Sequence, residues 1–73
     1  MSGQLVGRTG VVTLAIGGGD GLGEVELSFG GGTERFLARG VEPIEVDSAV
    51  LVVAERPGRV VDVERWTAFP AVF

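Results

Sequence analysis

The side chains of this chain that could do chemistry are carboxylates and arginines, because histidine, cysteine and lysine are all absent. Their absence removes the thiol nucleophile, the Ser-His pair, the Schiff-base lysine and the imidazole zinc ligand. Ten Asp and Glu residues leave an acid–base pair or an all-carboxylate metal site as formal options. Nothing beyond the presence of these acids supports either option. We therefore expect no enzymatic activity, no cofactor and no bound metal.

A glycine-rich stretch, GGGDGLG at residues 17–23, raises the question of a phosphate-binding loop. A P-loop needs a Lys after its last glycine, and a dinucleotide fingerprint needs another glycine spacing and a following helix. A strand pattern follows here, so we interpret the stretch as a hairpin connection, in which glycine supplies positive φ angles. Asp20 lacks the spacing of a calcium loop and is interpreted as a solvated charge. Because the corresponding loop of OB barrels borders the ligand face, Asp20 and Leu22 enter the candidate partner surface.

Two arginines lie four residues apart in one predicted strand. Arg35 and Arg39 therefore share a face. They either form ion pairs with Glu24 or Glu26 on the neighbouring strand or bind an acidic partner, and we favour the ion pairs. Both arginines belong to the candidate partner surface.

The C-terminal segment is apolar without any period. Trp66, Phe69 and Phe73 are three of the five aromatic residues of the chain. We favour a role in capping the open end of a barrel, and the alternative is an exposed patch for a partner or for self-association. Trp66 and Phe69 complete the candidate partner surface.

The elements that must position these residues are five short strands, with little or no helix. Val-rich and alternating patterns predict strands at residues 5–16, 23–29, 33–39, 49–55 and 59–65. Gly-rich residues 30–32 and Pro57-Gly58 predict turns, and the acidic residues 40–48 predict an irregular connection interrupted by Pro43. The run at 49–54 is apolar on both faces, which predicts a central strand.

This pattern predicts an all-β fold, a small five-stranded Greek-key barrel. OB-type and SH3-like barrels both fit, and the long first strand, bent at Gly7 and Gly10, favours the OB type. We assign residues 4–66 to the barrel and residues 67–73 to an apolar tail. Residues 1–3 are interpreted as a disordered N-terminus or a remnant of cloning.

Composition and charge limit the partners. The chain has 73 residues, a hydrophobic fraction of 45% and a formal net charge of −4, so we expect one folded domain that disfavours nucleic acid. The N-terminus lacks the features of a signal peptide, and the longest apolar run is far shorter than the ~20 residues of a membrane helix. We expect this segment to be soluble by itself.

Three motifs resemble a known family. LVGRTGVVT at residues 5–13, VLVV at 50–53 and VVDVE at 60–64 are similar to elements of the soluble domain of NfeD-like membrane proteins. The chain departs from that pattern in its longer first hairpin and in Asp47-Ser48, where the family normally has a glycine before the fourth strand.

The resemblance implies an OB barrel and a non-catalytic protein-interaction role. It implies a partner among stomatin- or flotillin-type (SPFH) scaffolds, in membrane organisation or protein quality control. It also implies a place on the cytoplasmic side of the membrane if the segment belongs to a longer anchored protein. The alternatives are an OB domain that binds nucleic acid or oligosaccharide and, with least support, a carboxylate enzyme.

Overall fold

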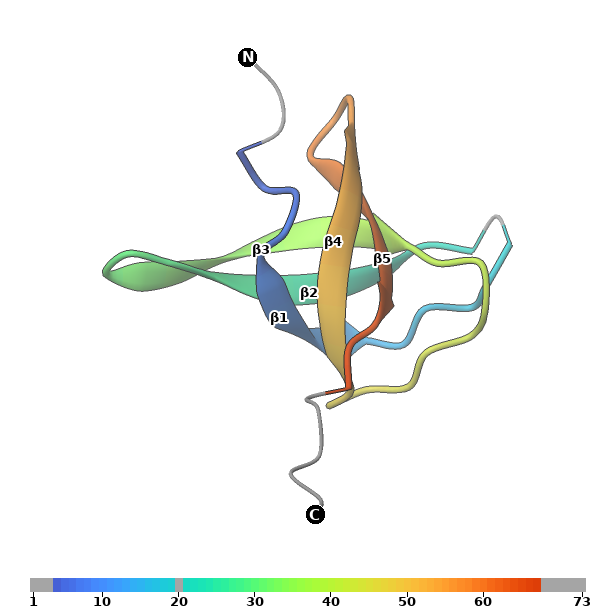
Figure 1. Ribbon diagram of the computed structural model, residues 1–73. Helices are drawn as coiled ribbons and strands as arrows, with labels where there is room; N and C mark the ends of the chain where they lie inside the picture. Colours follow the sequence, from blue (N-terminus) through green and yellow to red (C-terminus); the bar gives the residue numbers. More distant parts are fainter. Residues whose placement is uncertain (1–3, 20, 68–73) are drawn as a thin grey trace.

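Five strands close into one barrel (Figure 1). The computed structural model describes residues 4–19 and 21–67. The strands are β1 (Thr9–Leu14), β2 (Gly23–Phe29), β3 (Gly32–Arg39), β4 (Ala49–Arg56) and β5 (Val60–Arg65). They follow one another around the barrel in the order β1-β2-β3-β5-β4, with β1 also paired to β4. The β3–β5 pair is parallel and all others are antiparallel. This closed arrangement confirms the predicted all-β, OB-type fold.

The first strand is shorter than the predicted 5–16. The chain turns before it, where the Arg8 N–H donates to the Leu5 carbonyl at 3.0 Å and Gly7 adopts a φ of 93°. After Leu14 the ladder ends, and Ile16 instead forms an isolated bridge with Ile44. The boundaries at 32, 56 and 60 differ from the prediction by one residue each.

The barrel core comes from the inward-facing residues of all five strands. Alternation along β2 and β3 buries Val25 and Leu27, then Phe36 and Ala38. The connection at residues 40–48, which forms no helix, adds Ile44 to this core. The complete core consists of Val12, Ile16, Val25, Leu27, Phe36, Ala38, Ile44, Val50, Val52, Val61 and Val63.

Gly10 allows β1 to join both sides of the barrel. It lies opposite Leu27 of β2 and opposite Val50 of β4. A Cβ atom at this position would stand 2.4 Å from the Glu26 carbonyl oxygen, so no larger residue fits without moving the backbone. The first strand thus pairs on both sides, as expected of an OB barrel, while Gly7 lies in the turn before it.

The other strand irregularity that matters for the surface is in β4. The register between β4 and β5 shifts between Val52 and Ala54, which leaves Val53 as the extra residue of a β-bulge. Such bulges redirect a side chain and bend the strand. Within the described residues no helix is long and apolar enough to cross a membrane.

Candidate interaction surface

The outer face of β2 and β3 carries a ladder of charges. Arg35 lies between two carboxylates, with its Nη1 3.6 Å from Glu24 Oε1 and its Nε 4.0 Å from Glu26 Oε2. Thr13 and Thr33 donate their hydroxyl protons to these two glutamates at 2.6 and 3.0 Å. The ion pairing predicted for Arg35 is therefore confirmed. The same prediction for Arg39 is wrong, because neither Glu24 nor Glu26 forms an ion pair with it. This face, which binds oligonucleotides in many OB folds, here places Arg35 between two carboxylates.

The aromatic ring on this side of the barrel is not available for stacking. Phe36 is only 6% exposed, and the guanidinium of Arg59 lies 4.4 Å from its ring centroid. Among the described side chains, Trp66 is the exposed aromatic, at 44%. The backbone N–H of Trp66 donates to the Ala49 carbonyl at 2.9 Å. This bond holds Trp66, which follows β5, beside the start of β4.

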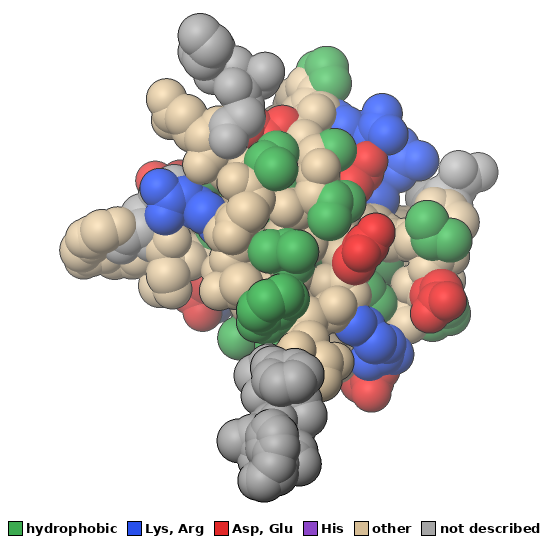
Figure 2. All heavy atoms as spheres, in the orientation of Figure 1, with side chains coloured by type: hydrophobic (Ala, Val, Ile, Leu, Met, Phe, Trp, Pro, Cys, Tyr) green, Lys and Arg blue, Asp and Glu red, His purple; other side chains and the backbone are tan. Residues whose placement is uncertain are grey.

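The outer face of β4 and the adjoining part of β1 form an apolar strip. We use this name for the residues Val11, Ala49, Leu51, Val53 and Trp66. Val11 lies opposite Ala49 in the β1–β4 ladder, and Val11 and Trp66 are each more than two-fifths exposed. Hydrophobic side chains gather along β4 in Figure 2. This matches the sequence pattern of 49–54, which is apolar on both faces of the strand.

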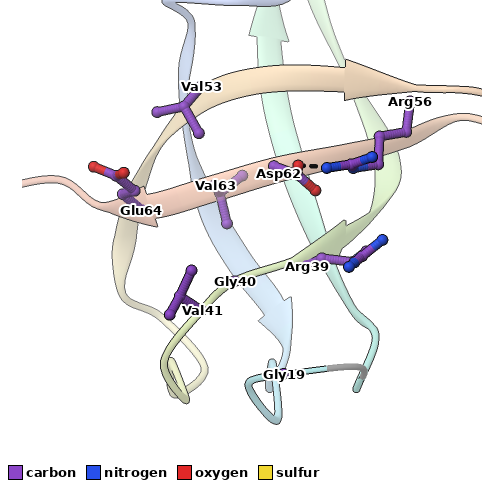
Figure 3. A pocket seen from close by; sticks show the side chains of 9 residues that line it. All are labelled: Gly19, Arg39, Gly40, Val41, Val53, Arg56, Asp62, Val63 and Glu64. Atoms are coloured by element: carbon purple, nitrogen blue, oxygen red, sulfur yellow. Dashed lines mark hydrogen bonds and ion pairs between the residues drawn. The ribbon is translucent and has the colours of Figure 1, made fainter.

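A groove crosses the outer face of β5 (Figure 3). Its main part has a volume of about 400 Å³, and a neighbouring part of about 290 Å³ extends it toward the 40–48 connection. Its walls are formed by the end of β3, the start of the 40–48 connection, β4, β5 and the backbone of Gly19 in the glycine-rich loop at residues 17–23. The main part is lined by Gly19, Arg39, Gly40, Val41, Val53, Arg56, Asp62, Val63 and Glu64.

The charges of the groove are only partly paired. Arg56 Nε donates to Asp62 Oδ2 at 2.7 Å, while Asp62 Oδ1 is buried and has no hydrogen-bond partner in the described structure. No described carboxylate forms an ion pair with Arg39, and no described cation pairs with Glu64. One cation and one anion therefore line the groove without an ion-pair partner among the described residues.

One ion pair closes the far end of the groove. Arg65 Nη2 donates to Glu45 Oε1 at 2.8 Å and to the Pro43 carbonyl at 3.1 Å. The hydrogen bond from Arg65 lowers the pKa of the Glu45 carboxyl and in return raises the pKa of the guanidinium. The pair anchors the 40–48 connection to the end of β5.

The glycine loop is held against the same connection. Gly18 and Gly19 have φ angles of 83° and 56°, which favour glycine. A Cβ on Gly18 would meet the Pro43 ring at 3.1 Å. The Gly19 N–H donates to the Val41 carbonyl at 3.4 Å, and this contact places the loop at the mouth of the groove.

Comparison with known families decides the identity of the domain. The family model of the NfeD C-terminal domain matches residues 9–64, which include β1 to β4 and all of β5 except its last residue. The chain belongs to this family. The resemblance inferred from the sequence motifs is thereby confirmed.

A solved structure agrees with this assignment of the NfeD domain. The soluble domain of the NfeD protein YuaF from Bacillus subtilis, determined in solution, is similar with a TM-score of 0.69 and 34% sequence identity. The similarity covers 81% of this chain and 70% of that one. The comparison with curated proteins finds no match.

One residue that departs from the family pattern has a backbone conformation that favours glycine. Asp47, at the place where we expected the family glycine, has a φ of 75°. Its N–H donates to the Val12 carbonyl at 2.8 Å, so the conformation is tied to the barrel. Aspartate tolerates this left-handed region better than most residues but less well than glycine.

The predicted surface residues of the NfeD domain do not form one site. Arg35 lies in the charge ladder, Arg39 lines the groove, and Trp66 ends the apolar strip. Leu22 is about half exposed in the glycine loop, and Asp20 and Phe69 lie outside the described residues. Residues 1–3 and 68–73 lie outside them as well.

Of the residues that line the main part of the groove, only Arg39 belonged to the predicted partner surface. Val41 is 90% exposed and Val53 is 39% exposed, and both line the groove together with Glu64. For Val53 a signal existed, since the 49–54 run leaves apolar residues on the outward face. For Val41 and Glu64 there was none, because their proximity depends on the parallel pairing of β3 and β5.

The described carboxylates do not form a metal site. Within residues 4–19 and 21–67, no group of three acidic side chains is placed to hold a metal ion. Asp62 and Glu64 share the outer face of β5, but Asp62 is already paired to Arg56.

Proposed function

We propose that this NfeD domain is a non-catalytic protein-interaction module whose partner is a stomatin- or flotillin-type (SPFH) scaffold. It acts on the cytoplasmic side of a membrane, as part of a longer anchored protein, in membrane organisation or protein quality control. The observation that carries the proposal is the apolar strip. Contiguous exposed apolar surface on a small domain marks an interaction site, and the exposed Trp66 at the end of this strip is a residue type enriched at interface hot spots.

The charge distribution supports a protein partner over a nucleic acid. The β2–β3 face opposes phosphate through Glu24 and Glu26, and the net charge of −4 adds a long-range repulsion. Phe36 is covered by Arg59, so single-strand stacking on this ring is blocked. No feature of the described surface favours oligosaccharide over protein.

The test is retention of the SPFH-type scaffold of the same organism on the full-length protein, in detergent-solubilised membranes. Val11→Asp introduces a charge into the strip, at a position 43% exposed. Leu37→Asp, on β3 at 44% exposure, is the matched control outside the strip. We expect Val11→Asp to weaken retention about tenfold or more, which corresponds to about 1.4 kcal/mol, and Leu37→Asp to retain the scaffold.

Two outcomes contradict the proposal. One is that the unaltered protein does not retain the scaffold. The other is that the two variants retain it equally while circular dichroism shows both to be folded. A parallel titration with single-stranded DNA at low salt should give no binding, and saturable binding there would favour the nucleic-acid alternative.

A further inference from the structure

We propose that the groove over β5 binds an extended peptide segment with an acidic and a basic side chain two residues apart, flanked by apolar side chains. The inference rests on the proposed role as a protein-interaction module and names a second contact surface, separate from the Val11 and Trp66 end of the apolar strip. Figure 3 shows the main part of the groove, which Arg39 and Gly19 line at one end. The neighbouring part continues it along β5 to Arg65. This elongated shape suits a chain in extended conformation.

The two unpaired charges set the spacing of the occupant. Arg39 lies beside Asp62 in the parallel β3–β5 register, and Glu64 is two residues further along β5. A rise of about 3.3 Å per residue and a strand spacing of about 4.8 Å place the Cα atoms of Arg39 and Glu64 about 8 Å apart. Side chains at i and i+2 of an extended peptide project to the same side about 6.6 Å apart. An acid and a base with this spacing can therefore reach Arg39 and Glu64 together.

Apolar side chains occupy the space between and beside these charges. In Figure 3, Val53 and Val41 lie on opposite sides of β5, with Val63 between them. The β4 bulge at Val53 turns this side chain toward the groove, and Val41 is the most exposed of the large apolar residues. Apolar neighbours of the peptide charges would cover both valines. Excluding water there lowers the local dielectric and strengthens the two ion pairs.

The floor and the rim of the groove add polar contacts. Asp62 Oδ1 has no donor in the described structure, although Oδ2 is bonded to Arg56. β5 is paired to β4 along its length and to β3 as far as Asp62. The charges of Arg39 and Glu64 supply the specificity for the side chains of the peptide.

The experiment is selection from a displayed library of random heptapeptides against the whole chain and three charge variants. We expect the unaltered chain to enrich peptides with an acid and a base two residues apart, in either order, beside apolar residues. Arg39→Glu makes both groove charges negative and should enrich two bases at the same spacing. Glu64→Arg makes both positive and should enrich two acids. Arg35→Glu, outside the groove, is the matched control and should enrich the original pattern.

A synthetic heptapeptide from the first selection then gives the affinity. Its binding to Arg39→Glu should be at least tenfold weaker than to the unaltered chain and to Arg35→Glu. Amide shifts in NMR spectra should concentrate at Val41, Val53 and Glu64. The proposal is overturned if no sequence is enriched over the bare support, if all four proteins enrich the same sequences, or if the amide shifts lie elsewhere.

The outcome separates this inference from the proposed function. If the scaffold is retained through the apolar strip and the selections fail, the groove is not a peptide site while the module stands. If the selections succeed and the scaffold is not retained, the groove binds protein segments and the SPFH partner is wrong.

Discussion

Replacement of Gly10 by alanine tests the close approach that closes the barrel. The added Cβ would lie 2.4 Å from the Glu26 carbonyl oxygen and 2.6 Å from Leu27 Cδ2. Ordinary van der Waals contact starts near 3.4 Å, so β1 and β2 must separate by about 1 Å at this point. The oxygen belongs to the backbone of a paired strand and cannot rotate away.

The expected cost follows from three contributions. Overpacking of this kind costs about 1–3 kcal/mol, and each weakened backbone hydrogen bond costs about 1 kcal/mol. The alanine also stabilises the folded state by about 0.5–1 kcal/mol, because it lowers the conformational entropy of the unfolded chain. With one weakened hydrogen bond, we therefore expect the free energy of unfolding to fall by about 1–3.5 kcal/mol. This is a large share of the roughly 4–11 kcal/mol typical for a chain of this length.

Gly32 provides the matched control. It is also a strand glycine, at the start of β3, and its Cβ would meet nothing within 4 Å. Gly32→Ala should leave the free energy of unfolding unchanged or raise it by up to about 1 kcal/mol. In urea unfolding followed by far-UV circular dichroism, a slope of about 1 kcal/mol per M places the Gly10→Ala midpoint at least about 1 M below that of the control. Midpoints within about 0.5 M of each other would refute the reasoning.

Three further predictions concern stability and ionisation. Asp47→Gly should raise the free energy of unfolding by about 0.5–1 kcal/mol in urea titrations, because glycine relieves the φ of 75°; a decrease would show that the aspartate side chain stabilises this turn. Leu27→Ala should lower the free energy of unfolding by about 2–5 kcal/mol, since this side chain is completely buried. A loss below about 1 kcal/mol would contradict that packing. The stabilisation from Glu45 and Arg65 should be present at pH 7 and lost as the pH falls through the lowered pKa of Glu45. In an NMR titration, Arg65→Gln should return that pKa toward 4.5, and an unchanged pKa would exclude the ion pair as its cause.

The candidate surfaces were only partly foreseeable. Strand alternation predicted that Arg35 shares the outer face with Glu24 and Glu26, and the pairing was found. The same reasoning grouped Arg39 with Arg35, yet Arg39 lines a different site. Alternation with a period of two predicts which face of a strand carries a side chain. Which side chains of other strands lie beside it depends on the order of the strands around the barrel.

Local chemistry in the sequence determined the elements and the family of this protein. Alternating Val and charged residues specify strands, glycines and Pro57 specify turns, and the motifs in 5–13, 50–53 and 60–64 identify an NfeD domain. The absence of His, Cys and Lys excluded whole classes of catalysis. These features are properties of neighbouring residues, so no long-range information was needed.

Only the tertiary structure decided where the surfaces lie. Closure joins β3 to β5 in parallel, and this pairing places Arg39 beside Asp62 although 22 residues separate them in the chain. The bulge at Val53 and the bridge between Ile16 and Ile44 bring the walls of the groove together. Such contacts depend on register and barrel closure, which are set by packing of the whole core. They cannot be inferred from the sequence of a single strand.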